Sequence, residues 1–386
     1  MDAAATDSRP LIAHLVFRLD YGGLENGVVN LVNGLPQHLF RHTVIALTEA
    51  SDFRRRIQRS DVAVHAVEKR PGKDPGAYLR LFRLIRSLRP AVLHTRNLGT
   101  LEGALIGRLA GARCSIHGEH GWDIYDPDGT NRKYRLLRRA MNPAVNAFVT
   151  VSEELRRWLI ERVGISATKV TRICNGVDVD RFQMRNDAAR AQLPPERFPA
   201  GTTIVGSVTR FSEIKDPLNL VRAFIEARRA PQGQGLRLLM LGDGPLRAPA
   251  EQLLEQAGQG GAAWLPGSRD DVAALMRAMD VFVLGSRREG ISNTVLEAMA
   301  SGLPVIVSAV GGNLELVRHD ETGMLVPPGD AAAIAAALLD YAARPARRLE
   351  HGTRARARAE REYSLRRMLA DYERLYRMHT GIGEAA

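Results

Sequence analysis

Short apolar runs alternate with amphipathic helical stretches along almost the whole chain, and each run is followed by a helical or turn-rich segment. Strands that alternate with helices in this way predict parallel sheets covered by helices on both faces. The predicted strands are Leu11–Phe17, Thr43–Leu47, Val62–Val67, Ala91–Thr95, Cys114–Ile116, Phe148–Val151, Thr203–Val208, Leu236–Leu241, Ala263–Leu265, Val281–Leu284 and Val305–Val307.

One polar stretch that contains proline and glycine, residues 186–202, interrupts this alternation and predicts a linker. The expected organisation is therefore a first Rossmann-like domain over 1–185, a second over 203–363, and a C-terminal helix and tail over 364–386. The predicted fold class is α/β, with two doubly wound domains facing across a cleft. Ligands of such folds bind beyond the carboxyl ends of the strands, so the loops that follow strands are the places to search.

The composition excludes several classes of protein. With 45% hydrophobic and 25% charged residues the chain is neither mainly disordered nor collagen-like. It has no uninterrupted apolar run long enough to span a bilayer, and its first residues, MDAAATDSRP, carry no secretory signal pattern. The two cysteines, Cys114 and Cys174, are far apart and form neither a disulfide framework nor a metal cluster. These features predict a cytoplasmic protein.

Basic residues exceed acidic ones, 54 to 43, which gives a net charge of +11. This excess fits an ordinary solvated surface, attraction to an anionic membrane, or nucleic acid. With only 5% aromatic residues, the chain has little to stack on bases. Residues 131–139 (NRKYRLLRR) read as a surface helix or as a mixed basic and apolar surface against anionic lipid. Residues 354–362 (RARARAERE) read as a solvated helix face.

The strongest motif follows the predicted strand Val281–Leu284. Ser292 or Asn293 is expected to cap a helix that runs to about Ser301, and the N–H groups of its first turn fit a diphosphate. Glu289 precedes this cap and Glu297 lies about one turn into the helix, so a single ligand could meet both acids through its hydroxyl groups. The alternative is a pair of solvated surface acids.

A second motif follows the strand Thr203–Val208. Arg210 and Lys215 lie in the loop before Pro217, which is placed to open a helix. At the carboxyl end of a strand these cations could neutralise a diphosphate leaving group; otherwise they are two ordinary surface charges.

Weaker signals come from glycines after other strands. Gly22 and Gly23 follow the first strand and allow close backbone approach to a ligand and unusual φ angles, although a plain turn fits equally well. Gly242 and Gly244 end another strand in a turn expected to line the same cleft. Gly22 and Gly23 belong neither to a dinucleotide fingerprint nor to a phosphate-binding loop of known pattern.

Two patterns superficially suggest a metal. His117 and His120 flank a glutamate, but they lie at a strand end without an evident third ligand. Asp178 and Asp180 form an Asp-x-Asp pattern in a turn that has no further ligand nearby. We therefore predict no metal site, and we expect the histidines to line the cleft or to serve the structure.

Taken together and in this order, these residues resemble the retaining glycosyltransferases of family 4, which have the GT-B fold. The sugar transferases of bacterial exopolysaccharide and PEP-CTERM systems resemble the segments HGEHGWD, REGISNTVLEAMASGLPVIVSAVGGN and GMLVPPGD closely. The resemblance rests on Gly22-Gly23, Glu119-His120-Gly121, Asn175–Asp178, Arg210 and Lys215, Gly242–Pro245, Glu289 and Glu297, Gly302–Ile306, and Gly311–Asn313.

The resemblance implies a role for each matching residue. Arg210 and Lys215 would hold the donor diphosphate, and Glu289 the hydroxyls of the donor sugar. The N–H groups around Ser292, Asn293 and Thr294 would bind the phosphates, and Glu297 would bind the ribose hydroxyls. His120 would lie beside the transferred sugar. Gly22-Gly23 would let the loop of the first domain approach the donor or the acceptor. Ile291-Ser292 replaces the Phe-Gly of many relatives and narrows the space near the sugar. The last helix would return to the first domain.

The predicted activity is that of a retaining, hexosyltransferase-type enzyme, cytoplasmic and peripheral to the inner membrane face. Its donor would be a UDP- or GDP-linked sugar, with no metal required, and its acceptor a saccharide or lipid-linked glycan in exopolysaccharide synthesis. Two alternatives stay open. A nucleotide-sugar 2-epimerase would release free sugar without an acceptor, and an Arg-rich nucleic-acid-binding protein would show steep salt dependence and indifference to Glu297→Ala.

Overall fold

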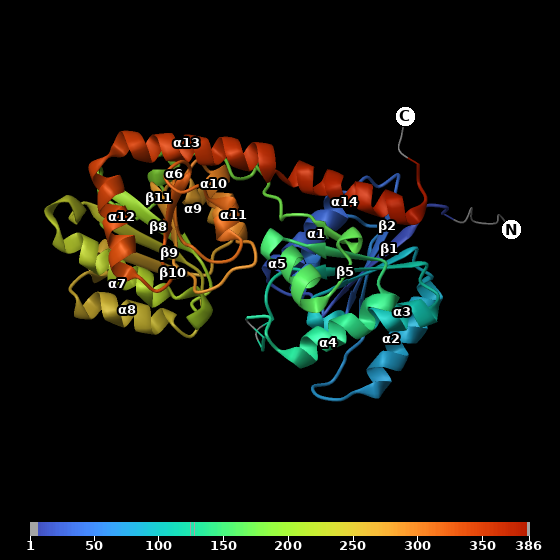
Figure 1. The fold of residues 1–386 in the computed structure, drawn as a ribbon. Coiled ribbons are helices and arrows are strands. Elements are labelled where there is room, and N and C mark those ends of the chain that lie inside the picture. The colour runs from blue at the N-terminus through green and yellow to red at the C-terminus, as the bar shows by residue number, and fades with distance from the viewer. Residues whose placement is uncertain (1–6, 124, 127, 384–386) are drawn as a thin grey trace. The chain divides into compact units, whose positions relative to one another are not determined.

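The computed structural model describes residues 7–123, 125–126 and 128–383 (Figure 1). The chain forms two compact units. The first contains the residues up to Asn175 together with those from Met368 on, and the second contains Gly176–Arg367. The last helix therefore belongs to the same unit as the first strand.

The first unit is built on a parallel sheet of seven strands in the order β3-β2-β1-β4-β5-β6-β7. Its strands are β1 (Leu11–Val16), β2 (Arg41–Ala46), β3 (Ala63–Ala66), β4 (Val92–Arg96), β5 (Cys114–Glu119), β6 (Ala147–Thr150) and β7 (Val170–Arg172). Its helices are α1 (Gly23–Gly34), α2 (Pro75–Leu88), α3 (Glu102–Ala110), α4 (Arg132–Met141), α5 (Glu153–Trp158) and α14 (Leu365–Thr380), which begins in the second unit.

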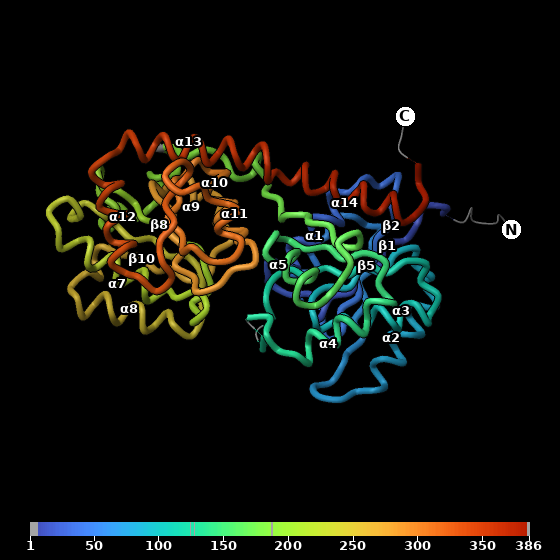
Figure 2. The backbone as a smooth tube through the Cα atoms, in the orientation of Figure 1, coloured from blue at the N-terminus to red at the C-terminus, as the bar shows by residue number. Residues whose placement is uncertain are grey.

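Helices cover both faces of this sheet. On one face Leu81 and Ile85 of α2 pack with Leu15 and Leu93 of the strands. On the other face Tyr376 of α14 contacts the strands, and Figure 2 shows this helix running alongside β1 and β2. The side chains that alternate along the inner strands β1, β4, β5 and β6 are thus buried on both faces, as their apolar runs require.

The second unit has a parallel sheet of six strands in the order β10-β9-β8-β11-β12-β13. Its strands are β8 (Thr203–Val208), β9 (Leu236–Leu241), β10 (Ala263–Gly267), β11 (Val281–Leu284), β12 (Val305–Ser308) and β13 (Gly323–Val326). Its helices are α6 (Asp187–Arg190), α7 (Pro217–Arg229), α8 (Arg247–Gln256), α9 (Val272–Met276), α10 (Asn293–Ala300), α11 (Asn313–Leu316), α12 (Ala331–Ala343) and α13 (Pro345–Glu362).

Each sheet has one point where the strand order reverses. In the first sheet β1 lies between β2 and β4, and in the second β8 lies between β9 and β11. The loops that leave the two strands at such a point diverge to opposite faces of the sheet and open a crevice at its carboxyl edge. In the second unit these are the loops after β8 and β11, which carry both of the stronger sequence motifs.

The predicted α/β class with two doubly wound sheets is confirmed, and so is the return of the last helix to the first unit. The unit boundary lies elsewhere than expected. The second unit begins at Gly176, before the stretch 186–202. That stretch is packed into the second unit, because Leu193 and Phe198 are buried and the Asn186 amide donates to the Arg277 carbonyl at 3.2 Å.

The arginine tract 354–362 lies on α13, and part of it faces protein rather than solvent. The Arg356 guanidinium donates to the Phe182 carbonyl at 2.6 Å, and that of Arg358 to the Glu315 carbonyl at 2.8 Å. The exposed fraction of the Arg358 side chain is only 10%. The expectation of a solvated face is therefore wrong for these two arginines, because their positions on the helix turn them toward backbone carbonyls.

Within the described residues, every helix is too short or too polar to cross a lipid bilayer.

Candidate functional site

The loop after β8 brings Lys215 to the reversal point of the second sheet. Beyond Val208 the chain passes the exposed Arg210, forms a 3₁₀ turn over Glu213–Lys215, and starts α7 at Pro217 as predicted. Asp216 joins the turn to the helix with a left-handed backbone, at a φ of 48°. Asp is one of the few non-glycine residues that adopt this conformation readily, so the local sequence suits the sharp bend.

Lys215 and Glu289 meet in an ion pair. The Nζ atom of Lys215 lies 2.5 Å from Oε1 of Glu289, which comes from the loop after β11. The same oxygen accepts a hydrogen bond from the hydroxyl of Ser286 at 2.7 Å. Both of these contacts are made by Oε1, and the second carboxylate oxygen, Oε2, is of a kind that can accept from a ligand hydroxyl.

A second ion pair ties the same two loops together. The Nε atom of Arg287 donates to the Asp216 carboxylate at 3.0 Å, and the Arg287 amide donates to the Ile214 carbonyl at 2.9 Å. The Asp216 side chain is only 8% exposed. Ile214 and Asp216, the residues on either side of Lys215, therefore both contact Arg287. Arg287 directly follows Ser286 in the sequence.

The helix α10 begins as the sequence predicted. Ser292 is the N-cap, and its hydroxyl accepts a hydrogen bond from the amide of Val295 at 3.3 Å. The first-turn amides of Asn293 and Thr294 face the helix start, where the helix dipole favours an anion. Glu297 lies farther along α10 and is half-buried.

Glycine at 312 allows close packing beside this cap. The Gly312 amide donates to the Gly290 carbonyl at 3.0 Å, and a Cβ at position 312 would lie 2.0 Å from that carbonyl oxygen. Ile291, the residue that departs from the family pattern, is buried against the same position.

Gly242 and Gly244 hold the loop after β9 against the loop after β8. Their φ angles are 123° and 146°, and a Cβ on either would lie within 2.6 Å of a backbone carbonyl, that of Thr209 or Phe211. Both positions therefore require glycine. The close packing of the two loops explains why glycine occurs at 242 and 244.

In the first unit, His120 directly follows β5. Its amide donates to Oδ1 of Asn97 at 2.7 Å, and its Nε2 atom lies over Gly118, where a Cβ would be 2.5 Å from it. Burial, reinforced by the positive charge of Arg96, lowers the pKa of His120 to about 3. The ring is therefore neutral near pH 7.

The expected unusual φ at Gly22 and Gly23 is wrong. Gly22 is extended, with a φ of −166°, and it caps α1, which begins at Gly23. A Cβ on Gly22 would lie 2.1 Å from the Glu25 carboxylate. Glycine at position 22 therefore leaves room for the Glu25 side chain and is not required by the backbone conformation.

The two patterns that suggested a metal have other partners. His117 Nδ1 lies 2.8 Å from the Thr95 hydroxyl and its Nε2 lies 3.3 Å from Glu119, which also accepts from Arg138 at 2.5 Å. Asp178 accepts from the amides of Asp180 and Arg181. In the described part of the chain no three His, Cys, Asp or Glu side chains gather into a set that could hold a metal.

Among the described residues of the predicted site, Lys215 contacts Glu289, and the hydroxyls of Ser292 and Thr294 lie 3.3 Å apart. Arg210 and Glu297 lie on the same two chain segments, within the second unit. Sequence reasoning assigned no role to Ser286, Asp216 or Arg287. These three residues lie within the same two sequence motifs, which could have drawn attention to them. The sequence of the motifs does not show which side chains face each other in the fold.

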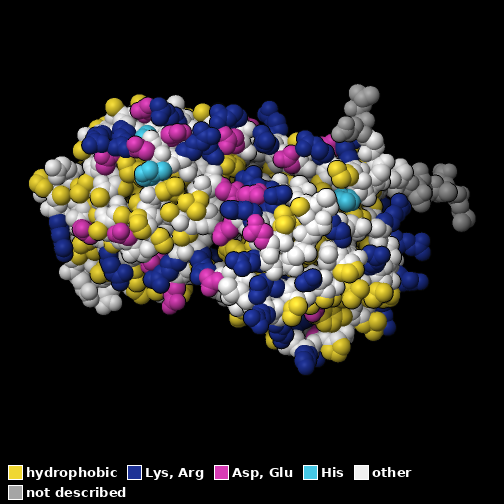
Figure 3. Space-filling view, viewed as in Figure 1, with side chains coloured by type: hydrophobic (Ala, Val, Ile, Leu, Met, Phe, Trp, Pro, Cys, Tyr) yellow, Lys and Arg dark blue, Asp and Glu magenta, His cyan; other side chains and the backbone are white. Residues whose placement is uncertain are grey.

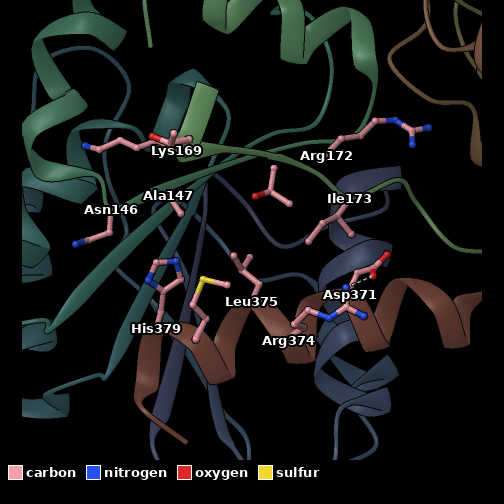
Figure 4. Close-up of a pocket in the computed structure, with 12 residues that line it drawn as sticks. Asn146, Ala147, Lys169, Arg172, Ile173, Asp371, Arg374, Leu375 and His379 are labelled. Carbon is pink, nitrogen blue, oxygen red and sulfur yellow. Dashed lines mark hydrogen bonds and ion pairs between the residues drawn. The ribbon is translucent and has the colours of Figure 1, made fainter. Parts of the chain in front are cut away.

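A hollow lies between α14 and the edge of the first sheet (Figure 4). Its volume is about 260 Å³. Ala147 lies at the start of β6 and Lys169 beside β7, whereas Leu375 and His379 come from α14. None of the predicted site residues lines it, so this hollow is separate from the strand ends considered above.

Comparison with known proteins now decides the family. A model described as glycosyl transferases group 1 matches residues 202–344, and one described as glycosyltransferase family 4 matches residues 21–181. The two matches fall mainly on different units and together span most of both. The chain belongs to the family 4 glycosyltransferases. It is thus an enzyme of the retaining class.

Individual relatives of this glycosyltransferase agree with that assignment. It is 28% identical to the UDP-Gal:alpha-D-GlcNAc-diphosphoundecaprenol alpha-1,3-galactosyltransferase of Escherichia coli, over 67% of this chain and 68% of the relative. It is 31% identical to EpsF of Bacillus subtilis (strain 168), a glycosyltransferase candidate by its name, over 53% of each chain. The Anabaena protein Alr3699/HepE, solved with UDP and glucose, shares the fold with a TM-score of 0.81 at 19% identity, covering 95% and 99% of the chains.

Proposed function

We propose that this glycosyltransferase moves a sugar from a nucleotide-diphosphate donor to a saccharide or lipid-linked acceptor in bacterial exopolysaccharide or related glycan synthesis. The observation that carries the proposal is the contact of Lys215 with Glu289 beside the N-terminus of α10. A cation, a carboxylate and a helix start then lie on the two loops that leave the reversal point of one sheet. Diphosphate, sugar hydroxyls and phosphate oxygens are the groups that these three features bind.

The proposed chemistry rests on stabilising the leaving group. As the bond between the sugar and the diphosphate breaks, negative charge grows on the diphosphate. Lys215, Arg210 and the first-turn amides of α10 offset that charge. Lys215 has three N–H donors, so it can keep its bond to Glu289 while it donates to a phosphate oxygen.

The roles of the remaining residues follow from their chemistry. Glu289, fixed through Oε1, accepts from a donor-sugar hydroxyl through Oε2, and Glu297 accepts from the ribose hydroxyls. His120 in the first unit is assigned to the transferred sugar as a neutral hydrogen-bonding group. The acceptor hydroxyl attacks on the face that the diphosphate leaves, forming the new glycosidic bond with retention and passing its proton to the departing phosphate.

The donor class finds support among the relatives. The Escherichia coli relative is named for UDP-galactose, and the Anabaena protein has also been solved with UDP-glucose. We therefore propose a UDP-linked donor first and a GDP-linked donor second. A cytoplasmic site fits the two cysteines, Cys114 and Cys174, since neither forms a disulfide in the described structure.

The test begins with a thermal-shift screen against UDP, GDP, ADP and their sugars, since a ligand that binds the folded state raises its apparent stability. With the donor that this screen selects, Lys215→Ala is expected to lower kcat by about 10²-fold or more. Glu297→Ala is expected mainly to weaken binding of the free nucleotide in calorimetry. Arg222→Ala, which removes an exposed cation of α7, serves as the control.

Two results would overturn the proposal. Full turnover in a variant that lacks both Lys215 and Arg210 would remove the diphosphate assignment. Release of an epimerised free sugar without any acceptor would replace transfer by epimerisation.

A further inference from the structure

The helices α2, α3 and α4 of the first unit carry an unusual excess of positive charge. Together they contain nine Lys or Arg residues and one acid, Glu102. Over the whole chain the ratio is 54 to 43. The acid is engaged, because the hydroxyl of Tyr78 donates to its carboxylate at 2.5 Å. Arg138 is buried in an ion pair with Glu119, and the other eight basic side chains are exposed or partly exposed on these three helices.

Large apolar side chains lie exposed on the same helices. Leu79 of α2 is 49% exposed, Leu109 of α3 is 67% exposed, and Leu136 of α4 is 64% exposed. Leu105, one helical turn before Leu109, is 41% exposed and so lies on the same side of α3. Exposed leucines that recur on neighbouring helices differ from the scattered ones expected on any surface.

The three helices are neighbours in the fold. The helix α3 packs against both α2 and α4. In the space-filling view, hydrophobic and basic side chains gather over the region where Figure 1 places α2, α3 and α4, with few acidic ones among them (Figure 3). We call this surface the three-helix face.

The chemistry of the three-helix face selects its partner. Arginine and lysine attract anionic headgroups, at about 1 kcal/mol per residue near an anionic surface, and leucine inserts into the boundary between headgroups and acyl chains. Nucleic acid would use the charges but not the leucines. We propose that the three-helix face docks on an anionic lipid bilayer. The proposal deepens the proposed function, since a lipid-linked acceptor is itself held in a membrane.

Two sets of variants separate charge from apolar contact. Arg83→Glu with Arg139→Glu reverses two exposed charges of the face, and Leu109→Gln with Leu136→Gln removes two exposed leucines without a change of charge. The matched controls lie in the second unit. Arg222→Glu with Arg229→Glu makes the same charge change on α7, and Leu349→Gln replaces a leucine of α13 that is 61% exposed.

Sedimentation with vesicles tests the proposal. The full chain is expected to bind vesicles of phosphatidylcholine with about 30% phosphatidylglycerol, and not phosphatidylcholine alone. The charge variant should weaken this binding at least about tenfold, since two cations near the surface become anions. The leucine variant should weaken it several-fold, and both controls should bind as the unaltered chain does.

Three outcomes would overturn the proposal. One is no binding to the anionic vesicles. Another is an equal loss in the α7 control, which would show that net charge alone drives adsorption. The third is binding to duplex DNA in place of vesicles, lost in the charge variant and unchanged in the leucine variant. Nucleotide binding is measured separately, so a chain that binds vesicles but no nucleotide sugar refutes the proposed function and leaves the membrane face intact.

Discussion

At the scale of single residues, two buried serines of the second unit offer a matched test of the site. Ser286 donates to Glu289, whereas the hydroxyl of Ser308 at the end of β12 has no hydrogen-bond partner among the described residues. Ser286→Ala should lower kcat/KM for the nucleotide sugar about fivefold, the effect of losing roughly 1 kcal/mol from one hydrogen bond. Ser308→Ala should leave kcat/KM unchanged. Equal effects of the two substitutions would contradict the positioning role of Ser286.

Residue-level prediction from sequence succeeded where the signal is local. The cap at Ser292 and the helix start at Pro217 follow from rules that involve a few neighbouring residues. The bonds of Ser286 and Arg287 were not predictable in the same way. Arg287 binds Asp216 across 71 positions of sequence, and only the folded sheet brings those two loops together.

At the scale of elements, the docking of α14 depends on a buried hydrogen bond. The hydroxyl of Tyr376 and Nδ1 of His94 lie 2.7 Å apart, and both side chains are fully buried. Tyr376→Phe should lower the free energy of unfolding by about 1–2 kcal/mol, because it removes this buried hydrogen bond and leaves Nδ1 only its 3.5 Å contact with Arg96. Urea denaturation measures this. Tyr125→Phe removes the same hydroxyl from a tyrosine that is 76% exposed and should change nothing, so a similar loss there would contradict the explanation.

Two strands escaped the sequence analysis, and both are the last strand at one edge of a sheet. The strand β7 has only three residues, and β13 begins at a glycine, so neither shows the apolar run by which the other strands were recognised. The edge strands β3 and β10 were predicted, so the short length of β7 and the initial glycine of β13, rather than edge position alone, explain the two omissions. The inner strands were predictable because burial on both faces forces a continuous apolar run.

At the scale of the whole molecule, buried histidines predict an acid-sensitive fold. His14 and His94 are fully buried, and burial lowers their pKa well below the ordinary value of 6.5; burial lowers the pKa of His42 to about 3. Below about pH 6.5 these histidines bind protons in the unfolded chain but stay neutral in the folded state. The free energy of unfolding should therefore fall as pH drops from about 6.5 towards 4, by up to about 1.4 kcal/mol per pH unit for each histidine.

Urea unfolding at several pH values between about 7.5 and 4.5 measures this slope. His42→Gln keeps a hydrogen-bonding side chain but cannot titrate, so its slope should be shallower by one proton. Replacement of the exposed His38 by Ala should leave the slope as it is. A free energy of unfolding that stays level across this range would contradict the prediction.

The position of α14, at the end of the chain but packed in the first unit, has a consequence for biosynthesis. The first unit is encoded at both ends of the chain, with the whole second unit between them. On the ribosome, the strands that carry His14 and His94 emerge early, but Tyr376 emerges only after the second unit has been made. The unit that starts first is therefore completed last, and until then one side of its sheet awaits a helix that has not yet been translated.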